Sequence, residues 1–319
     1  MQRKIQLACP APAGSTQGNR VTALRWARIL RDLGFRASLA PELEGKPDLL
    51  VALHARRSAA AAAEFKRRFP ERPLVVALTG TDLYKDLAEG NRAAQHSLEL
   101  ADRLIVLHSQ AKLDLPKEFR RKTRVIHQSV RLPKRLRSPA KNRFDVCVLS
   151  HLRAVKDPLR AALATRALPA DSRLFVRHLG RALDPRLEAR AKAESSKNQR
   201  YEWLGERAHP DAIRLLSASR LLIISSRMEG GANVIGEAAS LGIAILATDV
   251  PGNRGLLGPR HCGYFEFGDT DALRQLLRRA ESDSSFYRRL LTSSQRIAEQ
   301  FTPDCEFKSW RALLDEIAS

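Results

Sequence analysis

Two glutamates flank a glycine pair in the segment Ser225–Thr248, and this arrangement is the most chemically suggestive in the chain. Glu229 directly precedes Gly230 and Gly231, and Glu237 follows after seven intervening residues. A carboxylate only accepts hydrogen bonds, so each glutamate suits the hydroxyls of a sugar or a ribose. The glycines allow a ligand to approach the backbone closely. The plainer interpretation is a turn whose two glutamates are solvated or cap a helix.

The helix expected to begin near Asn233 complements these carboxylates. A strand ends near Ser226, a polar loop follows, and the chain returns to a strand at Ile243. In a parallel sheet such a loop lies at the carboxyl edge, where ligands bind. The first backbone N–H groups of a helix lack intrahelical partners and carry its positive dipole end, so Ala232, Asn233 and Val234 suit a diphosphate.

A basic segment, Ser150–Pro158, follows the strand expected at residues 146–149. It contains His151, Arg153 and Lys156. Cations at the end of a strand can offset negative charge that develops on a bound phosphate, which is often a large electrostatic contribution to catalysis. An exposed basic turn is the alternative interpretation.

The first half of the chain has comparable loops after its strands. Gly18, Asn19 and Arg20 lie between the first strand and the first helix, and they suit either an acceptor or a diphosphate. A simple helix cap formed by Asn19 is the competing interpretation.

Two further loops of the first half carry polar side chains. Thr81 and Asp82 follow the strand expected at 74–78, and Asp82 is placed to orient a substrate hydroxyl, unless the segment is a plain turn. Arg56 and Arg57 follow the third strand and suit a small anion, because a guanidinium offers paired N–H donors. A solvated start of a helix explains these arginines equally well.

The elements that must position these residues alternate between short apolar runs and amphipathic helical patterns, which indicates parallel α/β sheets. In the first half the expected strands are 5–9, 36–40, 49–53, 74–78, 104–107 and 125–127. In the second half they are 146–149, 174–179, 201–204, 221–225, 244–247 and 264–267. Each half is therefore predicted to be a doubly wound unit of its own.

The boundary between the halves is expected within Arg131–Arg143, a polar segment that contains Pro133 and Pro139 and shows no periodicity. This places the domains at 1–135 and 136–319. The last segment, Pro303–Ile317, is an amphipathic helix with no strand after it. In the first helix the apolar face ends at Gly34, which is expected to stop it.

The high positive charge of the chain limits the kinds of ligand or partner that it is expected to bind. The net charge is +20 and the pI is about 10.6, which favours anionic ligands: nucleic acid, an anionic membrane or small phosphorylated molecules. Aromatic and basic residues are not interleaved as on a surface that stacks nucleic-acid bases, so no nucleic-acid partner is predicted. An arginine-rich genome composition would explain the charge without any partner.

Several other classes of site and location are disfavoured. No apolar run is long enough to span a bilayer, and the N-terminus lacks the pattern of a signal peptide, so a cytoplasmic protein is expected. The four cysteines form no C-x-x-C pair. Asp269 and Asp271 form a D-x-D sequence, but a helix begins after them, and Asp271 is interpreted as its N-cap; no metal site is predicted.

The segment around Glu229 and Glu237 resembles the E-x7-E motif of retaining glycosyltransferases of family 4. Ala101–Ser109 resembles the family's "ADxxIxxS" strand, and Ser150–Pro158 resembles its "GRLxxxKG" segment. Lys156 matches the lysine of that segment, whereas His151 stands at the position of its arginine, which leaves open whether His151 or Arg153 shares its role.

Two loops of the first half extend the resemblance. Leu78–Tyr84 is similar to the family's "HGTD" loop, with Thr79 where a histidine often stands, and Pro12–Arg20 is similar to its glycine loop. The resemblance implies a GT-B fold: two Rossmann-like domains face a cleft, the first for the acceptor and the second for a nucleotide-sugar donor, and the C-terminal helix can pack back on the first domain.

The resemblance also implies roles for the residues singled out above. It implies an enzyme that needs neither metal nor cofactor. The implied catalytic residues are Lys156, Arg153 and Glu229. The implied donor-binding residues are His151, Arg153, Lys156, Glu229, Gly230, Gly231, Ala232, Asn233, Val234 and Glu237. The implied acceptor-binding residues are Gly18, Asn19, Arg20, Arg56, Arg57, Thr81 and Asp82.

A narrower resemblance covers nearly the whole chain. The ordered segments "PAPAGSTQGNRVTALRWARIL", "LHARRS", "LTGTDLY", "SHLRAVKDP" and "EGGANVIGEA" together resemble the selenosugar synthases of selenoneine biosynthesis, the SenB family. This implies that selenophosphate attacks the anomeric carbon of a UDP-sugar, such as a UDP-N-acetylhexosamine, and that UDP and phosphate are released. The alternatives are a glycosyltransferase with a cell-envelope or lipid acceptor, and a non-catalytic basic protein that binds nucleic acid or membrane.

Overall fold

The structure, a computed structural model, describes residues 2–15 and 18–318. Contacts divide the chain into two compact units. The first unit comprises Met1–Ser129 and Pro303–Ser319, and the second comprises Val130–Thr302. The chain thus leaves the first unit once and returns to it for its last helix. Among the described residues, no helix is long and apolar enough to cross a membrane.

The first unit is built on a six-stranded sheet in the order β2-β1-β3-β4-β5-β6, in which neighbouring strands run parallel. Its strands are β1 (Lys4–Ala8), β2 (Arg36–Ala40), β3 (Leu49–Leu53), β4 (Leu74–Leu78), β5 (Arg103–Val106) and β6 (Thr123–Val125). The five residues of β3 are all buried, as expected for a central strand with both faces covered. The predicted strands are confirmed, with ends shifted by one or two residues.

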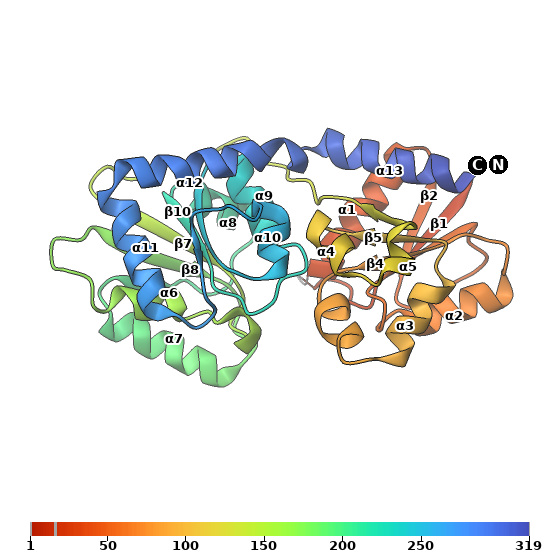
Figure 1. The fold of residues 1–319 in the computed structure, drawn as a ribbon, viewed down its shortest axis with the longest axis horizontal. Coiled ribbons are helices and arrows are strands. Elements are labelled where there is room, and N and C mark those ends of the chain that lie inside the picture. The colour runs from red at the N-terminus through yellow and green to blue at the C-terminus, as the bar shows by residue number, and fades with distance from the viewer. Residues whose placement is uncertain (1, 16–17, 319) are drawn as a thin grey trace. The chain divides into compact units, whose positions relative to one another are not determined.

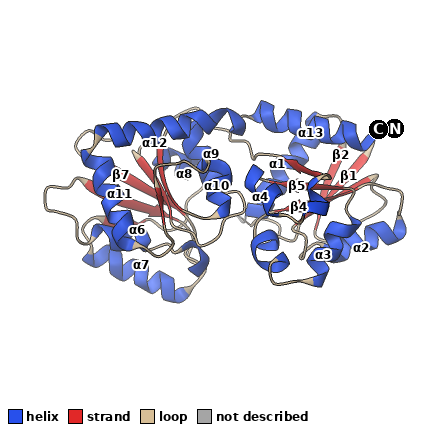
Figure 2. Ribbon diagram, viewed as in Figure 1, coloured by secondary structure: helices blue, strands red, loops and turns tan. Residues whose placement is uncertain are grey.

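Helices cover both faces of this sheet (Figure 2). They are α1 (Gly18–Asp32), α2 (Ala59–Arg68), α3 (Arg92–Leu100), α4 (Ser109–Asp114), α5 (Lys117–Arg120) and α13 (Pro303–Ala318), with a short π-helix, η1 (Asp82–Leu87). Alternate residues of a strand face opposite ways. Val51 accordingly packs in the cluster that holds α1 and α13, and Leu50 packs in the cluster that holds α2 and α3.

The C-terminal helix α13, blue in Figure 1, lies beside α1 at the red start of the chain. Trp26 of α1 and Trp310 of α13 are fully buried and meet edge to face, with ring centroids 5.0 Å apart. The expected return of this helix to the first half of the chain is confirmed. Gly34, with φ of +92°, ends α1 as predicted, because the Phe35 N–H there bonds back to the Leu30 carbonyl.

The second unit has a sheet of the same kind in the order β12-β11-β10-β7-β8-β9. Its strands, all in parallel pairs, are β7 (Phe144–Leu149), β8 (Leu174–Leu179), β9 (Tyr201–Trp203), β10 (Leu221–Ile224), β11 (Ala244–Thr248) and β12 (Tyr264–Phe265). The strands expected in the second half are thereby confirmed, and the fold class is two doubly wound α/β sheets.

Two groups of helices cover the opposite faces of this second sheet. One core cluster holds Leu221 and Ile223 of β10 together with α6 (Arg160–Thr165), α7 (Pro185–Lys197), α11 (Thr270–Ser282) and α12 (Ser284–Ile297). The other holds Leu222 and Ile224 together with α8 (His209–Ser217), α9 (Asn233–Ser240), α10 (Pro251–Leu257) and the 3₁₀ turn η3 (Ala298–Phe301).

Each sheet has one place where the strand order reverses. In the first unit β1 lies between β2 and β3, and in the second unit β7 lies between β8 and β10. The loops after β1 and β3, and those after β7 and β10, therefore leave the sheets side by side. Ligands of doubly wound sheets bind at this position. The predicted loops lie there, except the loop of Thr81 and Asp82, which follows the neighbouring strand β4.

The segment expected to link the halves, Arg131–Arg143, contains neither helix nor strand. Contacts assign it to the second unit, where the Arg137 N–H donates to the Ser217 hydroxyl over 2.9 Å. The chain passes between units at Ser129–Val130 and again at Thr302–Pro303. The Val130 N–H donates to the Phe301 carbonyl over 2.8 Å, so the two passages enter the second unit as a hydrogen-bonded pair.

Candidate functional site

An ion pair between Lys156 and Glu229 lies at the switch point of the second sheet. The Lys156 Nζ is 2.7 Å from Glu229 Oε1, and the Ser226 hydroxyl donates to the same oxygen over 2.5 Å. The Glu229 side chain is 9% exposed and that of Lys156 is 27% exposed. The structure thus brings together two residues that the sequence had predicted as one site from segments 73 positions apart.

Backbone contacts hold the two loops of this pair together. The Ser225 hydroxyl donates to the carbonyls of Lys156 and Asp157, over 3.1 and 2.8 Å, and the Arg227 N–H donates to the Val155 carbonyl over 2.8 Å. A single 3₁₀ turn, η2 (Ala154–Lys156), presents the lysine and ends at Asp157 in a left-handed conformation. Lys156 is therefore positioned by the neighbouring loop as well as by its own.

Glycines at two positions permit this close packing. A Cβ at Gly252, in the first turn of α10, would lie 2.0 Å from the Glu229 carbonyl oxygen. A Cβ at Gly180, after β8, would lie 1.8 Å from the Ser150 carbonyl oxygen. Only glycine fits such approaches. Sequence reasoning missed both, because each glycine is distant in sequence from the loop it contacts.

His151 and Arg153 differ in what they can contribute. The His151 ring is half-buried, and its Nδ1 accepts the Arg181 N–H over 3.1 Å. Burial lowers the pKa of His151 below its ordinary value, so at neutral pH its ring is uncharged. Arg153 is exposed at the start of η2. The positive charge of this loop accordingly comes from Arg153 and Lys156.

The helix α9 begins beside the glycine pair, as predicted. Its N-cap residue Ala232 makes no side-chain capping bond, which leaves the N–H groups of its first turn without that partner. Gly231 has φ of +149°, a conformation that favours glycine. Glu237 lies in the second turn, almost buried, and its Oε1 is 2.8 Å from Nε2 of the exposed His209 at the start of α8. His209 was not anticipated, because nothing in its neighbourhood resembles a motif.

Asp82 has a different task from the predicted one. Its side chain is fully buried, and its carboxylate accepts four backbone N–H bonds, from Ala55, Thr79, Gly80 and Leu83, at 2.7–3.1 Å. With no exposed oxygen, Asp82 cannot orient a substrate hydroxyl directly. It instead fixes the loop after β4 against the loop after β3.

The other predicted residues of this edge are brought together. Thr81 is exposed, and its Oγ1 is 2.9 Å from Nε2 of the buried His54 at the end of β3. Arg56 pairs with Asp86, with Nε and Oδ1 2.9 Å apart, while Arg57 lies exposed beside it. The two arginines and Thr81 thus come from loops that leave adjacent strands.

Gly18, Asn19 and Arg20 form the first turn of α1. Asn19 therefore lies within the helix and is not its N-cap, and its carbonyl accepts a weak bond from the Cys9 thiol at 3.7 Å. Arg20 lies close enough to the thiol to favour its ionisation, but burial outweighs this and raises the pKa of Cys9. Thr16 and Gln17, in the same predicted loop, lie outside the described residues.

Other candidate features have structural explanations. Asp269, rather than the predicted Asp271, caps α11 by accepting the Ala272 N–H over 2.8 Å, whereas Asp271 pairs with Arg274. Within residues 2–15 and 18–318, no three His, Cys, Asp or Glu side chains gather as they would around a metal ion.

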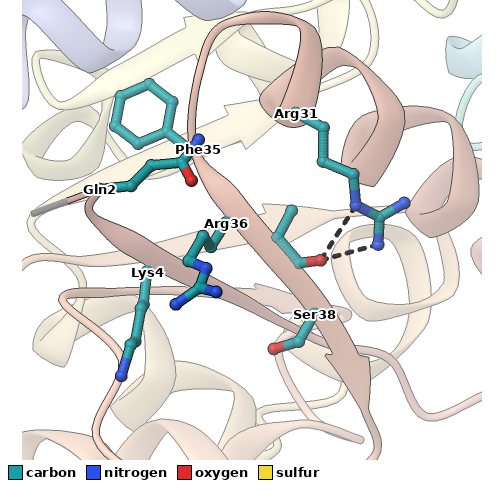
Figure 3. Close-up of a pocket in the computed structure, with 7 residues that line it drawn as sticks. Gln2, Lys4, Arg31, Phe35, Arg36 and Ser38 are labelled. Atoms are coloured by element: carbon teal, nitrogen blue, oxygen red, sulfur yellow. Dashed lines mark hydrogen bonds between the residues drawn. The ribbon is translucent and has the colours of Figure 1, made fainter.

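A shallow basic hollow lies at the opposite, amino-terminal edge of the first sheet (Figure 3). There the Arg31 guanidinium donates to the Ala37 carbonyl over 2.7 and 3.2 Å. The residues that line the hollow are Gln2, Lys4, Arg31, Phe35, Arg36, Ala37 and Ser38. It is therefore separate from the loops described above.

Structural comparison finds the same fold in several solved structures, of which one is described as a glycosyltransferase. A glycosyltransferase from Rickettsia africae aligns with a TM-score of 0.75 at 13% identity, over 100% of this chain and 99% of its own. HepE from Anabaena, in complex with UDP and glucose, aligns with a TM-score of 0.77 at 17% identity, over 99% of this chain and 100% of its own. The sucrose-phosphate synthase of Thermosynechococcus elongatus gives 0.78 at 15% identity over 100% of both chains. The predicted GT-B fold is thereby confirmed.

Sequence comparison supplies the family. A search of curated proteins gives no match. The model of the family "Glycosyl transferases group 1" matches residues 132–296, which is more than half of the chain and includes Lys156, Glu229 and Glu237. The chain therefore belongs to the group 1 glycosyltransferases.

Proposed function

We propose that this protein transfers a sugar from a UDP-sugar donor held at the switch point of the second unit. The observation that carries the proposal is the Lys156–Glu229 ion pair beside the uncapped start of α9. A cation and the N–H groups of a first turn that no side chain caps would meet the diphosphate, and a carboxylate that only accepts hydrogen bonds would meet hydroxyls. HepE, which has the same fold, was solved with UDP-glucose, and this supports the choice of donor.

Each predicted donor residue has a place in this proposal. The diphosphate lies against Lys156, Arg153 and the backbone N–H groups of residues 232–234. Gly230 and Gly231 allow its close approach. His151, uncharged and held by Arg181, contributes an Nε2–H donor to the same loop. Positive charge at this position stabilises the departing UDP as the glycosidic bond breaks.

The two glutamates divide the hydroxyls of the donor. Glu229 Oε1 accepts from Lys156 and Ser226, and no described residue donates to its Oε2, which is left for a sugar hydroxyl. Glu237, held by His209, takes the ribose diol. Donor binding then exchanges the Lys156–Glu229 pair for Lys156–phosphate and Glu229–hydroxyl bonds, so the charged groups keep partners throughout.

For the acceptor we propose selenophosphate, and for the donor a UDP-N-acetylhexosamine. The support is the ordered resemblance to selenosugar synthases, together with the cationic Arg56–Arg57 turn at the carboxyl edge of the first sheet. Selenium forms a bond to the anomeric carbon as the bond from that carbon to UDP breaks, and hydrolysis of the Se–P bond releases phosphate. A selenium anion is a strong nucleophile, so this chemistry needs no dedicated general base.

Two experiments test the donor and the acceptor separately. Calorimetry should show UDP binding to the wild type, with ADP and GDP weaker. Lys156→Ala should lower kcat by about 10²–10³-fold, whereas Lys192→Ala on the exposed face of α7 should not change it. Wild-type turnover by Lys156→Ala would refute the donor site.

The acceptor is tested by mass spectrometry of a reaction that contains the UDP-sugar and selenophosphate. We expect a selenium-containing sugar. If UDP binds normally but no such product forms, the choice of acceptor is wrong and the donor site stands.

A further inference from the structure

His54 is a buried histidine in an unusual backbone conformation. It directly follows β3, its φ is +79°, and it is 1% exposed. Side chains other than glycine rarely adopt this conformation, and such strain persists where the surrounding contacts require it, often at functional sites. His54 lies in the segment "LHARRS", but the resemblance assigns no site role to it.

The hydrogen bonds of His54 determine which ring nitrogen carries the proton. Its Nδ1 accepts the Arg57 N–H over 3.3 Å, so the proton of the neutral ring is on Nε2. The Nε2–H donates to the Thr81 hydroxyl oxygen over 2.9 Å. Asp86 Oδ2, which is buried without a hydrogen-bond partner, lies 3.8 Å from Nε2, and Asp82 Oδ2 lies 3.9 Å from Nδ1. The two carboxylates therefore favour neither nitrogen, and the Arg57 N–H decides the position of the proton. Burial lowers the pKa of His54, so the ring stays neutral at pH 7.

This arrangement leaves one donor directed outward. A threonine hydroxyl has a single hydrogen, and because the Thr81 oxygen accepts from His54, that hydrogen must point away from the ring. Thr81 is exposed, so its donor is available to a ligand. Arg57 is exposed as well, on the turn whose N–H holds the ring. A hydroxyl donor and a guanidinium thus lie on neighbouring loops at the ends of β3 and β4, joined through the His54 ring.

Neither acidic residue of this cluster forms an ion pair with Arg57. Asp82 is fully buried and directs its charge to four backbone N–H groups. Asp86 is paired through Oδ1 with Arg56. Among the described residues Arg57 forms no ion pair, so its exposed guanidinium is left for an anion.

We propose that His54 is a positioning residue that holds the Thr81 hydroxyl as a donor to a small tetrahedral oxyanion, which Arg57 also binds. The site takes phosphate-like anions through their oxygens. This inference deepens the proposed function, on which it rests for the identity of the acceptor as selenophosphate. His54 itself does not touch the anion.

The role of Thr81 is tested by measuring the Kd for inorganic phosphate in a ³¹P NMR titration. Thr81→Val keeps the shape of the side chain and removes the donor, and we expect its phosphate Kd to rise roughly 10-fold to 100-fold. Thr81→Ser keeps the hydroxyl and should bind like the wild type. Arg57→Ala should weaken binding at least as much as Thr81→Val, whereas Arg67→Ala, an equal change of charge at the exposed end of α2, should not.

The role of His54 is tested by two variants whose amide side chains differ in length. The amide of His54→Gln can occupy the position of Nε2 and donate to Thr81, so we expect phosphate binding near that of the wild type. His54→Asn tolerates positive φ better but is too short to reach Thr81, so we expect a Kd about 10-fold higher. A purely structural role of His54 predicts the opposite order, because asparagine suits this backbone better than glutamine.

Binding of UDP, measured on the same samples, separates the two proposals. A wild type that binds UDP but not millimolar phosphate would overturn this inference and leave the donor site standing. Equal phosphate binding by the wild type and Thr81→Val, or weaker binding by His54→Gln than by His54→Asn, would also overturn it. A wild type that does not bind UDP, but binds phosphate in a way that depends on Thr81, would refute the donor proposal and leave this inference standing.

Discussion

Replacement of Glu306 by alanine should strongly destabilise the first unit. Glu306 is 1% exposed on α13. Its Oε1 accepts from Arg25 Nε over 3.1 Å and from Trp26 Nε1 over 2.8 Å, and its Oε2 accepts from the N–H and hydroxyl of Ser129, over 2.9 and 2.5 Å. Since Ser129 is the last residue before the chain leaves this unit, Glu306 joins the returning helix to α1 and to the point of exit.

The size of the effect follows from these contacts. Glu306→Ala leaves Arg25, whose side chain is 11% exposed, without its ion-pair partner, and leaves the Trp26 and Ser129 donors unpaired. Removal of one member of a buried ion pair typically costs about 3–5 kcal/mol. We therefore expect the free energy of unfolding to fall by about that amount, and the midpoint of thermal unfolding to fall by roughly 10 °C.

Near-UV circular dichroism during urea unfolding measures this change. Trp26 and Trp310 are both buried in the first unit, so their signal reports its packing. Lys308→Ala, on the exposed side of the same helix, is the control and should leave the unfolding midpoint unchanged. If Glu306→Ala unfolds at the same urea concentration as the control, the carboxylate does not hold α13 and the reasoning fails.

Three further predictions concern the second unit. Burial lowers the pKa of His178 from 6.5 to about 4, so the folded protein loses stability as the pH falls from 6.5 toward 4. We expect the free energy of unfolding to be about 2 kcal/mol lower at pH 5 than at pH 7. Urea unfolding midpoints that do not change between pH 7 and pH 5 would contradict this. Gly252→Ala should yield folded protein that binds UDP at least about tenfold more weakly, because the added Cβ displaces the Glu229 backbone; unchanged calorimetric affinity would show that the loop can move at little cost. Glu237→Gln should lower the affinity for UDP by about tenfold and leave the affinity for pyrophosphate unchanged, because Glu237 is assigned to the ribose. An equal loss of affinity for both ligands would place Glu237 at the phosphates instead.

The strands of both sheets could be predicted because the sheets are parallel and covered on both faces. Each buried strand, such as Leu49–Leu53 or Leu221–Ile224, is then a short apolar run that stands out from the amphipathic helices around it. Their exact ends could not be predicted, because the last residues of a strand differ from loop residues only in backbone bonding. Thus β6 begins two residues earlier than expected, although Ile126 still bonds to the Val106 carbonyl.

The candidate site was predictable where its residues follow one another in a motif. Glu229, the glycine pair and the start of α9 are neighbours in sequence, so their spacing alone indicates a loop that enters a helix. His209 contacts Glu237 from 28 positions away, and the partners of Asp82 include Ala55, 27 positions away. Such contacts depend on which loops the sheet order brings together, and no local pattern records that order.

Hydrogen bonds between neighbouring loops at the carboxyl ends of the strands fix the polar groups of each unit before any ligand binds. In the second unit Ser225 and Arg227 bind the backbone of the lysine loop, and in the first unit Asp82 binds the backbone of two loops at once. Charges and donors held in this way need little reorganisation when a substrate binds, and such preorganisation gives electrostatic stabilisation most of its effect. This rigidity requires unusual backbone geometry at three residues that follow strand ends. Position 252 must be glycine because of its close approach to Glu229, and His54 and Asp157 have positive φ. Substitutions at these positions should therefore affect ligand binding more than they affect folding.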